Sequence, residues 1–128
     1  MENGVSPTSM KKSAQRDSAG LSWLIQVFSG LLLIFLLGLH IIAHHFIVEG
    51  GLRTYQDVID YISNPLVFAL EVIFLIVVTP HAMLGLYSIV LDMGPSQKTK
   101  NSIRWIFGFV TIVVIGFGIW LAIALQSL

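Results

Sequence analysis

The second long apolar stretch of this sequence contains polar and ionisable residues that a helix would align. His81, Gly85, Ser88 and Asp92 are offset by four, seven and eleven residues, and at about 3.6 residues per turn these offsets return to nearly one helical face. The face offers an imidazole, a position without a side chain, a hydroxyl and a carboxylate. An ionisable group in hydrocarbon is costly and usually functional. We therefore expect His81 to ligate a flat cofactor, with Gly85 leaving room for it.

The other three histidines lie near the end of the first apolar stretch. His40 and His44 are four residues apart and share a helical face, whereas His45 is turned about 100° away. At about 1.5 Å per residue, His40 is displaced roughly 10 Å from the centre of its span, and His81 about 4–5 Å in the opposite direction. The two are then ~15 Å apart along the membrane normal. If both ligate haem iron, there are two haems, and each needs a second histidine from another chain.

Other interpretations of these residues are open at this point. Histidines near a span end, such as His44 and His45, also occur as interfacial residues, and a zinc site of His40 and His44 lacks an acidic partner in its pattern. Glu71 is either a neutral packing residue or a proton-handling group. Asp92 is either a charge at a helix end or a proton donor beside a quinone.

Three long apolar stretches must position these residues. The chain has 128 residues, a mean hydropathy of +0.85 and 11% charged residues, values that indicate an integral membrane protein. A membrane-crossing helix needs about 20 apolar residues. We predict an all-α fold whose three transmembrane helices cover about residues 21–48, 65–91 and 105–125. Residues 1–20 are expected as a polar tail and residues 21–127 as one membrane domain, part of a helix bundle that a partner subunit completes.

Local signals bound the spans. Asn64, or the serine before it, can cap the second span, Pro65 suits its first turn, and Pro80 is expected to kink it. Residues 49–63 form a polar connection in which a short interfacial helix can form. Residues 96–104 are expected as a basic loop.

The basic residues predict the orientation. Six of the seven Lys and Arg residues precede the first span or lie between the second and third. The positive-inside rule makes that side cytoplasmic, so we expect a multi-pass protein of the inner (cell) membrane with its N-terminus in the cytoplasm and its C-terminus outside. No basic cluster indicates a nucleic-acid partner. Because cysteine is absent, this chain holds no disulfide, iron–sulfur cluster or thiolate-ligated haem.

Two stretches together resemble the membrane-anchor cytochrome b subunits of succinate dehydrogenase and fumarate reductase. The first is FSG at residues 28–30, with His40 ten residues after the glycine, and the second is HAxxG at residues 81–85 followed by LD at residues 91–92. The resemblance extends over residues 21–127 and agrees with the three-span topology. The second span and the connection before it favour the smaller, D-type anchor, with the C-type anchor still open.

The resemblance implies a heterotetramer of a flavoprotein subunit, an iron–sulfur subunit and two small anchors that together bind haem b and quinone. It places His81 at a haem-ligand position and His40 at the histidine that ligates a second haem in some members, with His44 as a fallback ligand. Ser29 and Asp92 fall near the cytoplasmic-side quinone pocket. The implied function is a non-catalytic subunit of a succinate:quinone oxidoreductase (respiratory complex II) that serves electron transport from the tricarboxylic acid cycle to quinone.

The sequence departs from the family pattern at two positions. Val27 stands where many members have an arginine, and Met93 where they have a tyrosine. Both of those residues commonly help to bind quinone, so the pocket is expected mainly on the partner anchor or in a different form. The alternative function is a cofactor-free structural or assembly subunit whose histidines only pack. The sequence leaves open whether succinate is oxidised or fumarate reduced, and which quinone is used.

Overall fold

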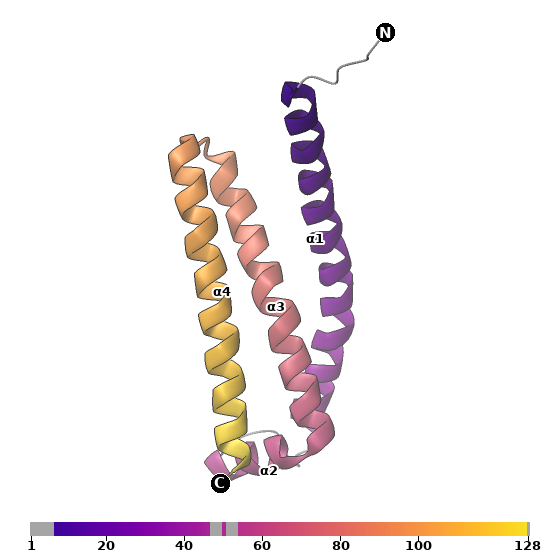
Figure 1. Cartoon of the computed structure of the whole chain (residues 1–128). Coiled ribbons are helices and arrows are strands. Elements are labelled where there is room, and N and C mark those ends of the chain that lie inside the picture. Colours follow the sequence, from indigo (N-terminus) through magenta and orange to yellow (C-terminus); the bar gives the residue numbers. More distant parts are fainter. Residues whose placement is uncertain (1–6, 47–49, 51–53, 128) are drawn as a thin grey trace.

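The computed structural model is a bundle of three long helices, and it describes residues 7–46, 50 and 54–127, with the backbone alone at residues 7, 9 and 11–19. The helices are α1 (Pro7–Phe46), α2 (Tyr55–Ser63), α3 (Pro65–Asp92) and α4 (Gln97–Gln126). The three long helices run side by side, and the short α2 crosses one end of the bundle (Figure 1). Each long helix has a segment long and apolar enough to span a membrane. The predicted all-α membrane protein with three spans is confirmed.

The two ends of the bundle differ, and we name them by their connections. At the α2 end, the end of α1, the whole of α2, the start of α3 and the end of α4 come together (Figure 1). The Gln126 amide Nε2 donates a hydrogen bond of 3.3 Å to the Ile62 carbonyl there, which joins α4 to α2. At the loop end, a turn through Gly94 joins α3 to α4. Gly94 has a φ of 71°, a left-handed conformation that glycine adopts without strain.

Helix starts follow from local hydrogen bonds. The Asn64 side chain accepts hydrogen bonds from the backbone N–H groups of Leu66 and Val67 at the start of α3, and Pro65 occupies the first turn, as predicted. A capping box between Thr54 and Asp57 begins α2, the short helix that the polar connection was expected to allow.

Two helices are longer than expected. α1 begins at Pro7 rather than near residue 21, so much of the segment expected as a polar tail is helical. The expected basic loop at residues 96–104 is wrong, because Ser96 caps α4 by accepting from the Thr99 N–H and the following residues form its first turns. The spans were predicted to start where the sequence becomes apolar, near residues 21 and 105. The polar residues just before those positions include no proline, so the helices continue through them. The predicted end of the first span at Val48 lies outside the described residues.

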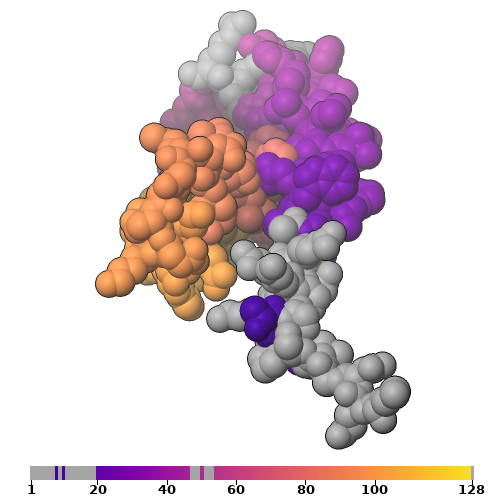
Figure 2. Space-filling view, turned by 90° about the horizontal axis from the view of Figure 1, so that it is seen from above, coloured from indigo at the N-terminus to yellow at the C-terminus, as the bar shows by residue number. Residues whose placement is uncertain are grey.

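α3 is the central helix of the bundle. Among the described residues, α1 and α4 both pack against α3 and make no contact with each other. α4 packs closely on α3 at Gly118, where a Cβ atom would lie only 2.5 Å from Leu75 Cδ2. α4 has no buried residue. Viewed from the loop end, the orange side chains of the α3–α4 end and the purple ones of α1 form separate ridges (Figure 2). The outer apolar surface is therefore left for lipid or other subunits.

Candidate functional site

His81 of α3 contacts α1 through a serine. The Ser29 Oγ atom lies 2.8 Å from His81 Nδ1. The same hydroxyl lies 2.6 Å from the Ile25 carbonyl oxygen of its own helix. A serine hydroxyl has a single proton. When the hydroxyl donates to the Ile25 carbonyl, the Ser29 oxygen accepts a hydrogen bond from His81 in the tautomer that carries its proton on Nδ1.

This arrangement leaves the other ring nitrogen of His81 available. Nε2 is then unprotonated, and it makes no hydrogen bond with any residue that the structure describes. A histidine that ligates a metal almost always donates its other N–H to a hydrogen-bond partner, which fixes the tautomer and the ring orientation. His81 therefore has the form required of an Nε2 ligand.

Two glycines allow α1 and α3 to approach closely around His81. A Cβ atom on Gly30 would lie 3.2 Å from His81 Cε1, and one on Gly85 would lie 3.1 Å from Gln26 Nε2. That Gln26 amide donates a 3.2 Å hydrogen bond to the His81 carbonyl oxygen. The gap expected at Gly85 therefore holds the end of the Gln26 side chain. α1 thus contacts both the ring of His81, through Ser29, and its backbone carbonyl, through Gln26.

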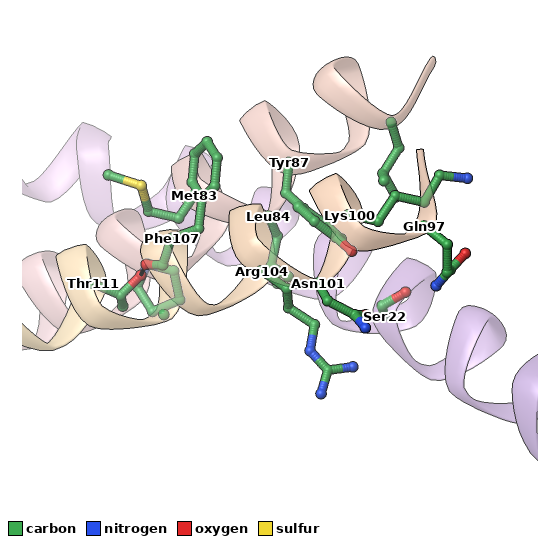
Figure 3. Close-up of a pocket in the computed structure, with 13 residues that line it drawn as sticks. Ser22, Met83, Leu84, Tyr87, Gln97, Lys100, Asn101, Arg104, Phe107 and Thr111 are labelled. Carbon is green, nitrogen blue, oxygen red and sulfur yellow. Dashed lines mark hydrogen bonds between the residues drawn. The ribbon is translucent and has the colours of Figure 1, made fainter. Parts of the chain in front are cut away.

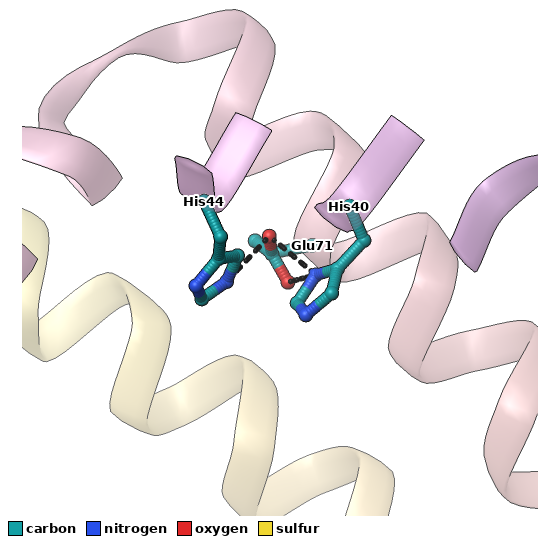
Figure 4. A group of neighbouring side chains, drawn as sticks. All are labelled: His40, His44 and Glu71. Carbon is teal, nitrogen blue, oxygen red and sulfur yellow. Dashed lines mark hydrogen bonds and ion pairs between the residues drawn. The ribbon is translucent and has the colours of Figure 1, made fainter. Parts of the chain in front are cut away.

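A second polar cluster gathers around Glu71 near the α2 end. His40 Nδ1 lies 2.9 and 3.0 Å from the two Glu71 carboxylate oxygens. His44 Nε2 lies 3.7 Å from Glu71 Oε1, and the Tyr61 hydroxyl donates to that oxygen at 2.6 Å. Figure 4 shows both imidazoles turned toward the carboxylate from α1. Three helices thus meet at one side chain, and ligand atoms of His40, His44 and Glu71 lie within 4.8 Å of one another.

Aromatic contacts hold this cluster in place. The His40 ring stacks on Phe74 with centroids 4.9 Å apart and also lies 4.2 Å from the His44 ring. Tyr61 is only 3% exposed. Burial, together with the hydrogen bond to Glu71, raises the pKa of the Tyr61 phenol above its ordinary value. The Tyr61 phenol therefore keeps its proton and donates it in the hydrogen bond to Glu71. On His40, Nε2 makes no hydrogen bond to a described residue.

The two histidine sites lie in different layers of the bundle. On α3, ten residues separate Glu71 from His81, which is about 15 Å along the helix axis. On α1, eleven residues separate Ser29 from His40, which is about 16 Å. The spacing of the contacts on both helices thus agrees with the ~15 Å between His40 and His81 that residue counting predicted. At this distance the two histidines cannot share one metal ion.

The residues expected near quinone are distributed over the loop end. Asp92 is exposed and is the last residue of α3. Gln26 and Ser88 line a cleft of about 300 Å³ between α1 and α3, which we name the α1–α3 cleft and whose other lining residues are Ser22, Trp23, Leu84, Tyr87 and Leu91. Ser29 is bonded to His81 instead. Gln26 Oε1 is buried and has no hydrogen-bond partner among the residues that the structure describes.

Comparison with known proteins agrees with this architecture. Residues 5–125 match the family described as succinate dehydrogenase/fumarate reductase transmembrane subunit. The chain belongs to this family. It is 29% identical over 110 residues to the succinate dehydrogenase hydrophobic membrane anchor subunit of Archaeoglobus fulgidus, an alignment that covers 86% of this chain and 93% of that protein. The subunit of the same name from Thermoplasma acidophilum is 29% identical over 114 residues, with 89% and 93% covered. No solved structure matches.

The family assignment confirms the membrane-anchor prediction, and both relatives agree with the D-type anchor. The anchor is a multi-pass membrane protein. Sequence reasoning missed two contacts of these sites. Tyr61 binds Glu71 from a short helix, and Gln26 binds the His81 carbonyl from the neighbouring span; neither residue stands in a motif. The signal that could have found them is the presence of Glu71 and His81 in apolar spans, since buried polar side chains need hydrogen-bond partners.

Proposed function

We propose that this anchor binds haem b at His81, shares a second haem with its partner anchor at His40, and helps to transfer electrons from an iron–sulfur subunit to membrane quinone. The loop end would face the cytoplasm, since Lys98, Lys100 and Arg104 lie there. The iron–sulfur and flavoprotein subunits would dock on that side. The whole would be a succinate:quinone oxidoreductase of the inner (cell) membrane, in which this chain performs no catalysis itself.

The observation that best supports this proposal is the chain of hydrogen bonds from His81 through Ser29 to the Ile25 carbonyl. It holds the imidazole in one tautomer and orientation, with Nε2 left for iron. Bound haem would supply one-electron chemistry. The protein's part is to fix the ligand, and Gln26 and Gly85 keep α1 close enough to do so.

The second haem is proposed at the α2 end. With His40 donating an Nδ1–H to the Glu71 carboxylate, Nε2 would be left for iron there as well. His44 is the fallback ligand, one turn further along α1. Because the two layers are about 15 Å apart along α3, each haem needs its other axial histidine from the partner anchor.

Quinone is proposed to bind near the α1–α3 cleft, close to the iron–sulfur subunit. The buried Gln26 Oε1 has no partner in the described part of the chain and can accept a hydrogen bond from a hydroxyl of the reduced quinone. The Ser88 hydroxyl lines the same cleft. Asp92 stands at the aqueous edge of α3, where it could exchange protons with water. The arginine and tyrosine absent at residues 27 and 93 would come from the partner anchor or be replaced by these groups.

A reduced-minus-oxidised visible spectrum of the purified complex, with haem quantified per complex, tests the proposal. We expect the spectrum of b-type haem and two haems per complex. A pure, intact complex without this spectrum would establish the competing function, a cofactor-free structural or assembly subunit. One haem per complex would refute the second site at His40 while leaving the first.

A further inference from the structure

A larger cleft lies between α3 and α4, with one lining residue from α1. Its volume is about 720 Å³, and we name it the α3–α4 cleft. It follows α4 from Gln97 to Thr111, fourteen residues or about 21 Å along the helix axis. Half the hydrocarbon core of a bilayer is about 15 Å thick. The cleft is therefore long enough to extend from the membrane surface through most of one leaflet.

The lining of this cleft changes from basic and polar to mostly apolar along its length. Lys100, Arg104, Gln97 and Asn101 line the part near the loop end, and Met83, Phe107 and Thr111 line the deeper part (Figure 3). Among the thirteen described residues that line it, none is acidic. The Tyr87 hydroxyl lies on the side of Lys100 and Asn101 (Figure 3). The lining therefore matches a molecule with a negatively charged head and an apolar tail.

A glycine keeps the apolar part open. A Cβ atom at Gly108 would meet nothing within 4 Å, in contrast to Gly118, which packs against Leu75. Gly108 lines the cleft rather than packing against a neighbouring helix of this chain. The space over it suits a hydrocarbon chain.

We propose that the α3–α4 cleft binds an anionic phospholipid, with the phosphate between Lys100 and Arg104 and one hydrocarbon chain over Gly108 and Phe107. Basic pockets between transmembrane helices at the membrane surface bind such head groups. The positive end of the α4 dipole adds to the attraction at Gln97. Among the described residues, α1 packs on α3 and not on α4, so the side of α4 that faces the cleft is left open. The bound lipid would fill this space.

Lipid binding to the purified complex with all its subunits tests this proposal. The complex is delipidated in mild detergent, and binding of dioleoyl phosphatidylglycerol is counted by native mass spectrometry, with dioleoyl phosphatidylcholine as the neutral-headgroup probe. The charge variant is Lys100→Gln with Arg104→Gln. Its matched control is Lys98→Gln, a nearby basic residue that does not line the cleft. The third variant, Gly108→Leu, fills the apolar part and leaves the charges in place.

The expected results separate the head from the tail. Each basic residue at the surface contributes roughly 5-fold to phosphatidylglycerol affinity, so the double variant should lose about 25-fold. Phosphatidylcholine binding should stay unchanged in that variant, and Lys98→Gln should bind both lipids as the wild type does. Gly108→Leu should weaken both lipids.

Three outcomes would overturn the proposal. The first is equal phosphatidylglycerol binding in the double variant and the Lys98 control. The second is full displacement of the lipid by millimolar inorganic phosphate, which would show a site for free phosphate rather than for a lipid. The third is loss of a partner subunit from the double variant with all its lipid sites intact, which would show that a protein covers the cleft.

Discussion

His81 Nδ1 lies 2.8 Å from the Ser29 hydroxyl oxygen, and this contact joins the central helix to α1 at a fixed height in the bundle. The hydroxyl donates a hydrogen bond to the Ile25 carbonyl, which leaves its oxygen to accept one from His81 Nδ1–H. In the proposed haem site, this serine would thus select Nε2 as the nitrogen that binds iron. The variants below test the two histidine sites and the loop end separately.

Replacing His81 should remove one haem. We expect His81→Ala to lower the haem content of the assembled complex by one, because the proposed iron ligand is lost. Haem is measured by pyridine haemochrome per complex. His45→Ala is the control, since His45 is exposed on the other side of α1 and should keep the full content. Unchanged haem in His81→Ala would refute the assignment.

Removing the Ser29 hydroxyl should weaken the same site without deleting the ligand. In Ser29→Ala the His81 N–H loses its acceptor, and haem affinity there should fall by about 10–100-fold. The reduction potential of that haem should also change, which redox titration detects. Ser63→Ala is the matched control, because the Ser63 hydroxyl donates to the Ile59 carbonyl of its own helix and does not contact His81. Identical potentials in wild type and Ser29→Ala would contradict the role given to Ser29.

The second haem should depend on His40 more than on His44. His40→Ala should remove that haem, whereas His44→Ala should retain it with an altered spectrum, because His44 reaches Glu71 only at 3.7 Å. Low-temperature spectra that resolve the two haems distinguish these results. If the complex keeps both haems in His40→Ala and loses one in His44→Ala, the ligand is His44.

Tyr61 should make the complex sensitive to alkaline pH. Its pKa is raised in the folded state by burial and by the Glu71 hydrogen bond, so the folded protein keeps the phenol proton that the unfolded chain loses above about pH 10. The stabilisation is complete below that pH and declines as pH rises further. The Tm difference between wild type and Tyr61→Phe should therefore shrink between pH 9 and pH 11. Tyr55→Phe is the control, since Tyr55 is exposed, and a constant difference would contradict the expectation.

Asp92 should influence quinone and leave haem unaffected. Asp92→Asn keeps the size of the side chain and removes its charge. We expect slower quinone reduction, because the aqueous proton exchange at this edge is lost, with assembly, haem content and succinate oxidation by a soluble artificial acceptor preserved. Normal quinone turnover across the pH range would leave Asp92 as an ordinary charge at a helix end.

Much of this architecture could be predicted from the sequence because a bilayer imposes a length and a polarity on each span. Asn64 and Pro65 marked the start of α3, because the first backbone N–H groups of a helix need a local acceptor and proline has no N–H to satisfy. The helical first turns of α4 could not be predicted from hydropathy, since that measure reports where the apolar surface ends and not where the helix ends. Helix start signals at Ser96 would have been the better guide.

The pairing of His40 with Glu71 was within reach of the sequence. Each residue is displaced by seven positions, or about 10 Å, from the centre of its own span in the same direction. Two polar groups at one depth in hydrocarbon are natural partners. Which faces of the helices meet was not deducible, because the apolar surface extends around α3 and offers no stripe that would orient it.

The position of Glu71 in the chain has a consequence for biogenesis. A charged side chain in the apolar part of an inserting helix is costly, up to about 2.5–3.5 kcal/mol at the helix centre, so α3 alone would leave the translocon with part of this penalty at Glu71. Its two closest partners, His40 and Tyr61, both precede it in the chain and are synthesised first. The Glu71 side chain therefore enters the membrane after its hydrogen-bond partners have been synthesised, and the order of translation favours the correct insertion of the central helix.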